Sequence, residues 1–166
     1  MVIIFSFSQN IVLAQDLSEL ISTVEKEYNL PSGLLKAIVE VESRLKAYAI
    51  NVDGKAVIAK SQLGASKIIR SYLRQGYTNI DIGLAQINWH WHGDNFGSID
   101  EMLTPKNNVK YAAKLLADLY EKHGDWQKVV RLYHSANPYH HRQYSRKVLL
   151  SWLNDSDVRS LVTNHK

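Results

Sequence analysis

Two glutamates in one predicted helix, Glu40 and Glu42, are the acidic residues best placed to do chemistry. Residues two apart in a helix point about 200° apart around its axis, so the two carboxyls face different surroundings. Glu42 lies one turn after Ile38 and continues the apolar side of the helix, whereas Glu40 is expected to point to water. Burial raises the pKa of a carboxyl, as a general acid near neutral pH requires. Glu42 is therefore the candidate catalytic acid, unless it merely ends the helix and pairs with Arg44 or Lys46.

A polar segment further along the chain, Asp81–Asn88, has the composition of a ligand-binding loop. It joins a glycine-containing turn to two amides, Gln86 and Asn88, which alternate with apolar Ala85 and Ile87. This alternation lets one side of the segment be buried while the amides face a ligand. Sugars are bound by amides that hydrogen-bond hydroxyl groups and by aromatic rings that stack on pyranose faces. Three such rings follow: Trp89, Trp91 and Phe96.

The seven histidines include two close pairs, His90 with His92 and His140 with His141. No third ligand at a recognisable spacing accompanies either pair. We therefore expect no metal site and no cofactor.

Composition narrows the chemistry available to the 166 residues. The chain has no cysteine, which excludes a disulfide framework, a thiolate nucleophile, an iron–sulfur cluster and cysteine-ligated zinc. The formal net charge of +4 suits an anionic partner such as nucleic acid, a membrane surface or the bacterial cell wall, or serves solubility alone. We expect no nucleic-acid partner, because no recognition signature accompanies the basic residues of the last predicted helix. These are Arg142, Arg146 and Lys147.

Apolar residues at helical spacing predict a compact all-α single domain without internal repeats or linkers. Asp16, Ser32 and Asp125 are expected to cap three helices, and Thr104-Pro105 is typical of a helix start. The expected helices cover residues 16–28, 32–45, 61–75, 105–123, 126–136 and 140 onward.

Two stretches between the predicted helices are expected to be irregular. Residues 49–60 are predicted to form a loop with a turn at Asp53-Gly54, and residues 79–97 are polar, aromatic and without clear periodicity. The candidate acid thus ends a helix, whereas the amides fall in the second irregular stretch.

The first 14 residues carry no charge and are apolar over too short a stretch to cross a membrane. They suit the apolar region of a secretory signal with cleavage before Gln15, although a basic start is missing. The alternative is a buried N-terminal strand or helix. We therefore predict a signal peptide (1–14), a catalytic domain (15–154) and a polar C-terminal tail (155–166), and a periplasmic location.

Four short motifs in register resemble the family 1 (SLT-type) lytic transglycosylases. They are Glu42-Ser43 at a helix end, DIGLAQIN at 81–88, RLYHS at 131–135, and Tyr144 with Val148. The resemblance extends from Leu20 to Trp152. The insertion between residues 51–54 and Asp81 resembles the small specialised members found with conjugation, type IV secretion and pilus systems.

The resemblance implies a lysozyme-like α fold and cleavage of the β-1,4 bond between N-acetylmuramic acid and N-acetylglucosamine in peptidoglycan. Glu42 would be the sole acid and base, and the muramyl C6 hydroxyl would close onto C1 to give 1,6-anhydromuramic acid. Two residues depart from the family pattern, since Ala85 replaces the usual Met and His134 the usual Asn. The implied substrate-binding residues are Ser43, Gln86, Asn88, Tyr133, His134 and Tyr144.

Two alternatives remain open from the sequence: a hydrolytic muramidase that uses the same glutamate, and a non-enzymatic wall-binding scaffold. Asp53, Asp81 and Asp94 are possible second carboxylates for a hydrolase, although each also suits a loop or cap. The expected partners are peptidoglycan glycan strands and proteins of a secretion, conjugation or pilus apparatus, and the expected state is a monomer.

Overall fold

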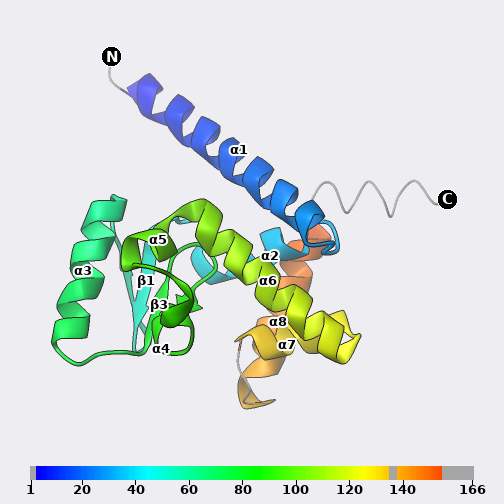
Figure 1. Ribbon diagram of the computed structural model, residues 1–166. Coiled ribbons are helices and arrows are strands. Elements are labelled where there is room, and N and C mark those ends of the chain that lie inside the picture. The colour runs from blue at the N-terminus through cyan, green and yellow to red at the C-terminus, as the bar shows by residue number, and fades with distance from the viewer. Residues whose placement is uncertain (1–2, 135–137, 155–166) are drawn as a thin grey trace.

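The computed structural model describes residues 3–134 and 138–154, with the side chains of residues 15–134 and 142–154 (Figure 1). The helices are α1 (Ile3–Glu27), α2 (Leu34–Ser43), α3 (Gln62–Arg74), α4 (Trp89–His92), α5 (Ile99–Leu103), α6 (Pro105–His123), α7 (Trp126–His134) and α8 (Pro138–Asn154). The strands are β1 (Ala49–Val52), β2 (Lys55–Ile58), β3 (Ile80–Ile82) and β4 (Ile87–Asn88). A 3₁₀ turn, Gly93–Asn95, follows α4. The predicted tail, residues 155–166, lies outside the described residues.

Helix starts and ends follow the local signals at several positions. Ser61 caps α3 by accepting a hydrogen bond from the Gly64 amide at 3.1 Å. Gly124 ends α6 in the left-handed region, with φ 63°, and Asp125 then caps α7 by accepting from the Gln127 amide at 2.8 Å. These predicted boundaries are confirmed, because each depends on neighbouring residues alone.

Two predicted caps are wrong. α1 begins at Ile3, so Asp16 lies inside a helix and caps nothing. Ser32 does not cap α2, because Gly33 occupies the cap position with φ 80°. The residues of the predicted signal peptide that are described form the first part of α1, and the signal itself stays a prediction.

The start of α2 is capped from outside the helix. The Glu25 carboxylate of α1 accepts hydrogen bonds from the backbone amides of Gly33, at 2.8 Å, and Lys36, at 3.1 Å. Glu25 is only 4% exposed. A buried carboxylate at a helix N-terminus satisfies unpaired amides and interacts favourably with the helix dipole. Glu25 therefore fixes the start of the helix that ends with the candidate acid.

Replacement of Glu25 by Ala is expected to lower the free energy of unfolding by about 1–3 kcal/mol, because the buried amide of Gly33 and the part-buried amide of Lys36 lose a charged acceptor. Chemical denaturation would measure the loss. Glu19→Ala is the matched control, since Glu19 is an exposed residue of the same helix, and it should change stability by less than about 0.5 kcal/mol. Equal effects of the two substitutions would contradict the capping role.

The two stretches expected to be irregular contain a four-stranded antiparallel sheet in the order β2-β1-β3-β4. β1 and β2 form a hairpin whose turn residues, Asp53 and Gly54, have φ values of 48° and 84°. Positive φ at both turn residues gives the twist that a two-residue hairpin requires. Strands of two to four residues are too short to show a period of two, so the sequence pattern did not reveal them.

The sheet and the helices share one hydrophobic core. In Figure 1 the sheet lies with α3 and α5 near the start of α6, α7 and α8 lie toward its end, and α2 overlaps it in this view. α2 and α7 both pack on α8, and α1 packs on α2 and α6. The fold is a mostly helical single domain with a small sheet, which confirms the predicted fold class. Within the described residues, every helix is too short or too polar to span a membrane.

Candidate active site

Glu42 lies in the last turn of α2, where the chain leaves the helix through two left-handed residues, Arg44 and Leu45. The pKa of Glu42 is raised from 4.5 to about 7, chiefly by burial and to a smaller extent by the negative charge of Asp81. The Tyr144 hydroxyl lies close enough to favour the charged carboxylate and offsets part of this rise. The two groups do not reach full hydrogen-bond geometry, since that hydroxyl has no partner among the described residues. Glu42 is therefore about half protonated near neutral pH, so it can both give and take a proton there.

Two hollows meet at Glu42. The sheet-side cavity has a volume of about 420 Å³ and the helix-side cavity about 450 Å³, and Glu42 and His134 line both. An extended ligand that occupies both cavities would therefore have the Glu42 carboxyl near its middle. The sheet-side cavity is lined by Glu42, Asn51, Asn79, Asp81, Gln86, Ile87, Asn88, Trp91, His92, Leu115, Tyr133 and His134. The helix-side cavity is lined by Val41, Glu42, His134, Arg142, Gln143, Tyr144 and Lys147.

The segment between β3 and β4 presents its amides as its alternation predicts. Ala85 and Ile87 are buried, whereas Gln86 and Asn88 face the sheet-side cavity. Gln86 has a φ of 47°, and its amide donates to the carbonyl of Gly83 at 2.8 Å. Asn88 donates to Asp81 at 2.8 Å. These bonds hold both amides in place, so the cavity wall is formed before any ligand arrives.

Gly83 is required where this segment turns. Its φ is +81°, and a Cβ there would lie 2.6 Å from Nδ2 of Asn108. Asn108 is fully buried on α6, accepts a hydrogen bond from the Ala85 amide at 2.8 Å and donates to the carbonyls of Ile82 and Met102 at 2.9 and 3.1 Å. A single amide side chain therefore ties the segment to the core.

Two tyrosines flank the acid from different helices. Tyr133 of α7 donates its hydroxyl to the Ala85 carbonyl at 2.9 Å. Burial and the charges of Glu42 and Asp81 raise its pKa, so it stays protonated. Tyr144 of α8 is 5% exposed and stacks on the His134 ring, with centroids 4.1 Å apart. The Tyr144 pKa is also raised, chiefly by burial.

The structure brings six of the seven predicted site residues around the two cavities. Ser43 is the exception: it is 6% exposed and donates to the Val39 carbonyl of its own helix at 3.2 Å. It therefore supports the end of α2 and lines neither cavity. Glu40 also differs from expectation, because it is half-buried and accepts a hydrogen bond from Ser151 of α8 instead of pointing to water.

Several cavity residues were not assigned from the sequence. Asn51 of β1 lines the sheet-side cavity, and its buried amide oxygen has no hydrogen-bond partner among the described residues. Asn79 donates to Asp53 at 3.0 Å and accepts from Asn88 at 2.9 Å. Pairing of β1 with β3 brings these residues together. Only recognition of the pairing between β1 and β3 would have revealed them.

Of the three possible second carboxylates, Asp81 alone lines a cavity at Glu42. Burial raises the Asp81 pKa, and the Asn88 hydrogen bond lowers it. Asp53 is exposed at the hairpin turn, and Asp94 lies in the 3₁₀ turn. Asp81 thus acts on the acid through its charge.

His90 and His92 each lie beside an aromatic side chain. His90 packs edge-on against Trp91, and His92 lies 3.1 Å from the Tyr111 hydroxyl. Burial lowers the pKa of His92, so its ring is neutral near pH 7. Among the side chains that the structure describes, no three His, Asp or Glu residues are grouped to hold a metal ion. His140 and His141 lie outside the described side chains.

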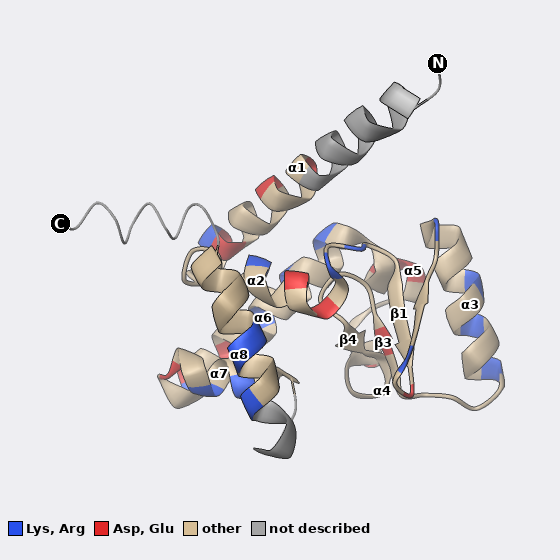
Figure 2. Cartoon of the chain, turned by 180° about the vertical axis from the view of Figure 1, so that it is seen from behind, with Lys and Arg blue, Asp and Glu red and all other residues tan. Residues whose placement is uncertain are grey.

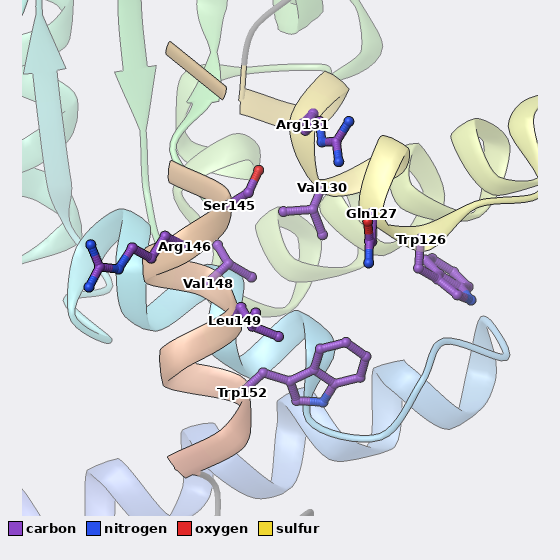
Figure 3. Close-up of a pocket in the computed structure, with 9 residues that line it drawn as sticks. All are labelled: Trp126, Gln127, Val130, Arg131, Ser145, Arg146, Val148, Leu149 and Trp152. Atoms are coloured by element: carbon purple, nitrogen blue, oxygen red, sulfur yellow. The ribbon is translucent and has the colours of Figure 1, made fainter. Parts of the chain in front are cut away.

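A third hollow, of about 270 Å³, lies between α7 and α8 (Figure 3). It shares no lining residue with the two cavities at Glu42 and contains no carboxyl, so it is not the acid site. We call it the α7–α8 groove. Its lining is mostly apolar: Trp126, Gln127, Val130, Arg131, Ser145, Arg146, Val148, Leu149 and Trp152.

A carboxyl with a raised pKa between two cavities, with amides and an exposed tryptophan lining one of them, is suited to acid-catalysed cleavage of a polysaccharide. The chain belongs to the transglycosylase SLT domain family, whose model matches residues 19–148. That family consists of lytic transglycosylase enzymes. Protein IpgF from Shigella sonnei is 34% identical over 110 residues, which cover 63% of this chain and 57% of IpgF. The chain thus spans little more than half the length of that relative. No solved structure matches the chain.

Proposed function

We propose that this protein is a lytic transglycosylase that cleaves the MurNAc-β-1,4-GlcNAc bond of peptidoglycan without water. The observation that carries the proposal is the Glu42 carboxyl, whose pKa of about 7 leaves it able to give and take a proton at the meeting point of two cavities. Membership of the SLT family supplies the reaction class.

In the proposed reaction Glu42 first protonates the glycosidic oxygen as the bond from that oxygen to C1 breaks. The resulting carboxylate then removes the proton from the C6 hydroxyl of the same muramyl sugar, and O6 bonds to C1. The proton taken from O6 replaces the one that was given, so Glu42 is restored and no water is consumed. Asp81 helps by keeping the acid protonated before the first step.

Digestion of purified sacculi with mass analysis of the muropeptides tests this reaction. The anhydro product is one water lighter than the product of hydrolysis, so the two are separated directly. We expect 1,6-anhydromuramic acid ends in all released fragments. Fragments with reducing muramic acid ends alone would overturn the proposal.

A hydrolytic muramidase is the second candidate, because Asp81 lines the same cavity as Glu42. A hydrolase needs a second carboxylate to activate water or bind the sugar cation, whereas the C6 hydroxyl replaces that water in the anhydro reaction. Asp81→Asn separates the two. It should abolish hydrolysis, but in a transglycosylase it should leave turnover within about tenfold of the wild type at acidic pH.

Trp91 is the expected sugar-stacking residue of the cleft. Its side chain is 74% exposed at the wall of the sheet-side cavity, a position that a stacked pyranose ring would cover. Trp91→Ala should weaken binding of a glycan fragment by about 3- to 10-fold, measured by calorimetry. Tyr77→Ala is the control, since that exposed ring lies outside both cavities. Unchanged affinity in the Trp91 variant would exclude the stacking role.

We further propose that the protein is exported to the periplasm and works there as a monomer on glycan strands near a secretion, conjugation or pilus apparatus. The uncharged residues 1–14 and the insertion before Asp81 support this assignment. N-terminal sequencing of the protein from a periplasmic fraction should begin at Gln15, and light scattering should give the monomer mass. An uncleaved cytoplasmic product would contradict the export.

A further inference from the structure

The two cavities at Glu42 differ in charge. Among the residues that the structure describes, no lysine or arginine lines the sheet-side cavity, where Asp81 is the acidic residue besides Glu42. The helix-side cavity is lined by Arg142 and Lys147 of α8, and Glu42 is the one carboxyl among its described lining residues. Figure 2 marks the basic residues of α8 in blue along that helix. The cleft is therefore acidic and amide-rich on one side of the acid, and basic on the other.

The two basic side chains have no structural use among the described residues. Arg70 and Lys110 form ion pairs with Asp100, at 3.0 Å, and Glu27, at 2.6 Å. Arg142 and Lys147, in contrast, make no ion pair or hydrogen bond within the part of the chain that the structure describes. Their charges are therefore available to a ligand in the helix-side cavity.

These cations do not serve the acid either. A positive charge beside Glu42 would lower its pKa and weaken it as a proton donor. The pKa of Glu42 instead responds to burial, Tyr144 and Asp81. Arg142 and Lys147 thus line the cavity without neutralising the acid.

The two sugars of the glycan strand also differ in charge. N-acetylglucosamine is neutral, whereas the muramyl sugar carries a lactyl ether at C3. That group ends in a free carboxylate when the stem peptide has been removed, and in peptide carboxylates when the peptide is present. Arginine binds carboxylates through paired N–H donors, and lysine through a compact charge.

We propose that Arg142 and Lys147 bind a carboxylate on the C3 substituent of a muramyl sugar in the helix-side cavity. This assignment rests on the proposed function and names the charged group that the site selects. Its consequence is orientation: the strand enters with its anionic substituent over α8, which fixes which glycosidic oxygen faces Glu42.

Binding is measured with Glu42→Gln as the background, so that no ligand is cleaved, and Arg142→Gln/Lys147→Gln is added. The ligands are peptide-bearing glycan fragments, the same fragments freed of peptide by an amidase, and a neutral N-acetylglucosamine oligomer. Arg146→Gln is the control, because it removes one positive charge from the same helix at a residue that lines the α7–α8 groove (Figure 3).

We expect the double substitution to weaken an anionic ligand by about 5- to 20-fold, as for two solvent-exposed charge pairs, and the neutral oligomer by less than twofold. If only the peptide-bearing fragments lose affinity, the site binds stem-peptide carboxylates. If only the peptide-free fragments lose affinity, it binds the lactyl carboxylate. The charge-keeping variant Arg142→Lys/Lys147→Arg should restore most of the affinity.

An equal loss for the neutral oligomer, or no difference from Arg146→Gln, would overturn the proposal. With Glu42 intact, the double variant should lower kcat/KM for anionic strands by a similar factor. If the unmodified protein released no anhydro fragments, the proposed function would fail. The binding comparison would still decide whether the helix-side cavity recognises a carboxylate.

Discussion

Glu42→Gln is expected to fold like the unmodified protein and to lose about 10²- to 10⁴-fold in the rate of muropeptide release, the usual contribution of a general acid. Glutamine has nearly the same shape and can still accept a hydrogen bond, but it has no proton to give to a glycosidic oxygen. Release from sacculi is measured by chromatography, and folding by circular dichroism.

Glu40→Gln is the matched control. It makes the same chemical change two residues earlier, at a carboxyl that accepts a hydrogen bond from Ser151 and lines neither cavity. Its rate should stay within about threefold of the unmodified protein. Substantial turnover by the Glu42 variant would mean that another group is the acid. If the function of the protein did not depend on Glu42 at all, a scaffold role would be favoured.

The same substitution is expected to change stability by an amount that depends on pH. The Glu42 pKa is raised from 4.5 to about 7, so the folded protein binds this proton more tightly than the unfolded chain. The carboxyl therefore costs no stability below pH 4.5, and a growing amount as pH rises to 7. Glu42→Gln removes that cost. At pH 8 it should raise the free energy of unfolding by about 1–3 kcal/mol, but at pH 4 it should change it little.

The pH profile of kcat/KM follows from the same group. Only protonated Glu42 can act as the acid, so the rate should fall above about pH 7, tenfold for each further pH unit. Asp81→Asn removes a negative charge that raises this pKa, so the fall should begin at a lower pH. A profile that does not move in this variant would show that Asp81 does not act on the acid.

Asn108→Ala is expected to lower the free energy of unfolding by about 3–4 kcal/mol, the largest loss of stability that we predict. The substitution leaves the amide of Ala85 and the carbonyls of Ile82 and Met102 without their partner in a fully buried place. Buried polar groups that lose their hydrogen bonds carry their full desolvation cost. Denaturant unfolding measures the change.

Activity should fall together with stability in this variant, because the freed segment carries Gln86 and Asn88. Asn107→Ala is the control: the neighbouring side chain makes one longer hydrogen bond, 3.4 Å to the Glu101 carbonyl. It should cost less than about 1 kcal/mol. Similar losses in the two variants would show that Asn108 does not hold the segment in place.

The sequence alone determined those features that depend on neighbours within a few residues. Helical spacing predicted α2 and α3, because a period of 3.6 is repeated over ten or more residues, and the signals at Thr104-Pro105 and Gly124 predicted the ends of α6. The same period placed Glu42 on the inner side of α2, and alternation predicted that Ala85 and Ile87 are buried while Gln86 and Asn88 face the cleft. The choice of Glu42 over Glu40 follows from this local geometry.

The tertiary structure decided everything that needed a distant partner. Glu25 caps a helix whose start lies eight residues away, and Asn108 holds a segment more than twenty residues earlier. The short strands exist because pairing with one another satisfies their backbone groups, and this pairing brings Asn51 and Asp81 into the cleft. For the pKa of Glu42, likewise, the sequence predicted only that burial raises it. Its rise to about 7 required the burial that α2, α7, α8 and the sheet provide together.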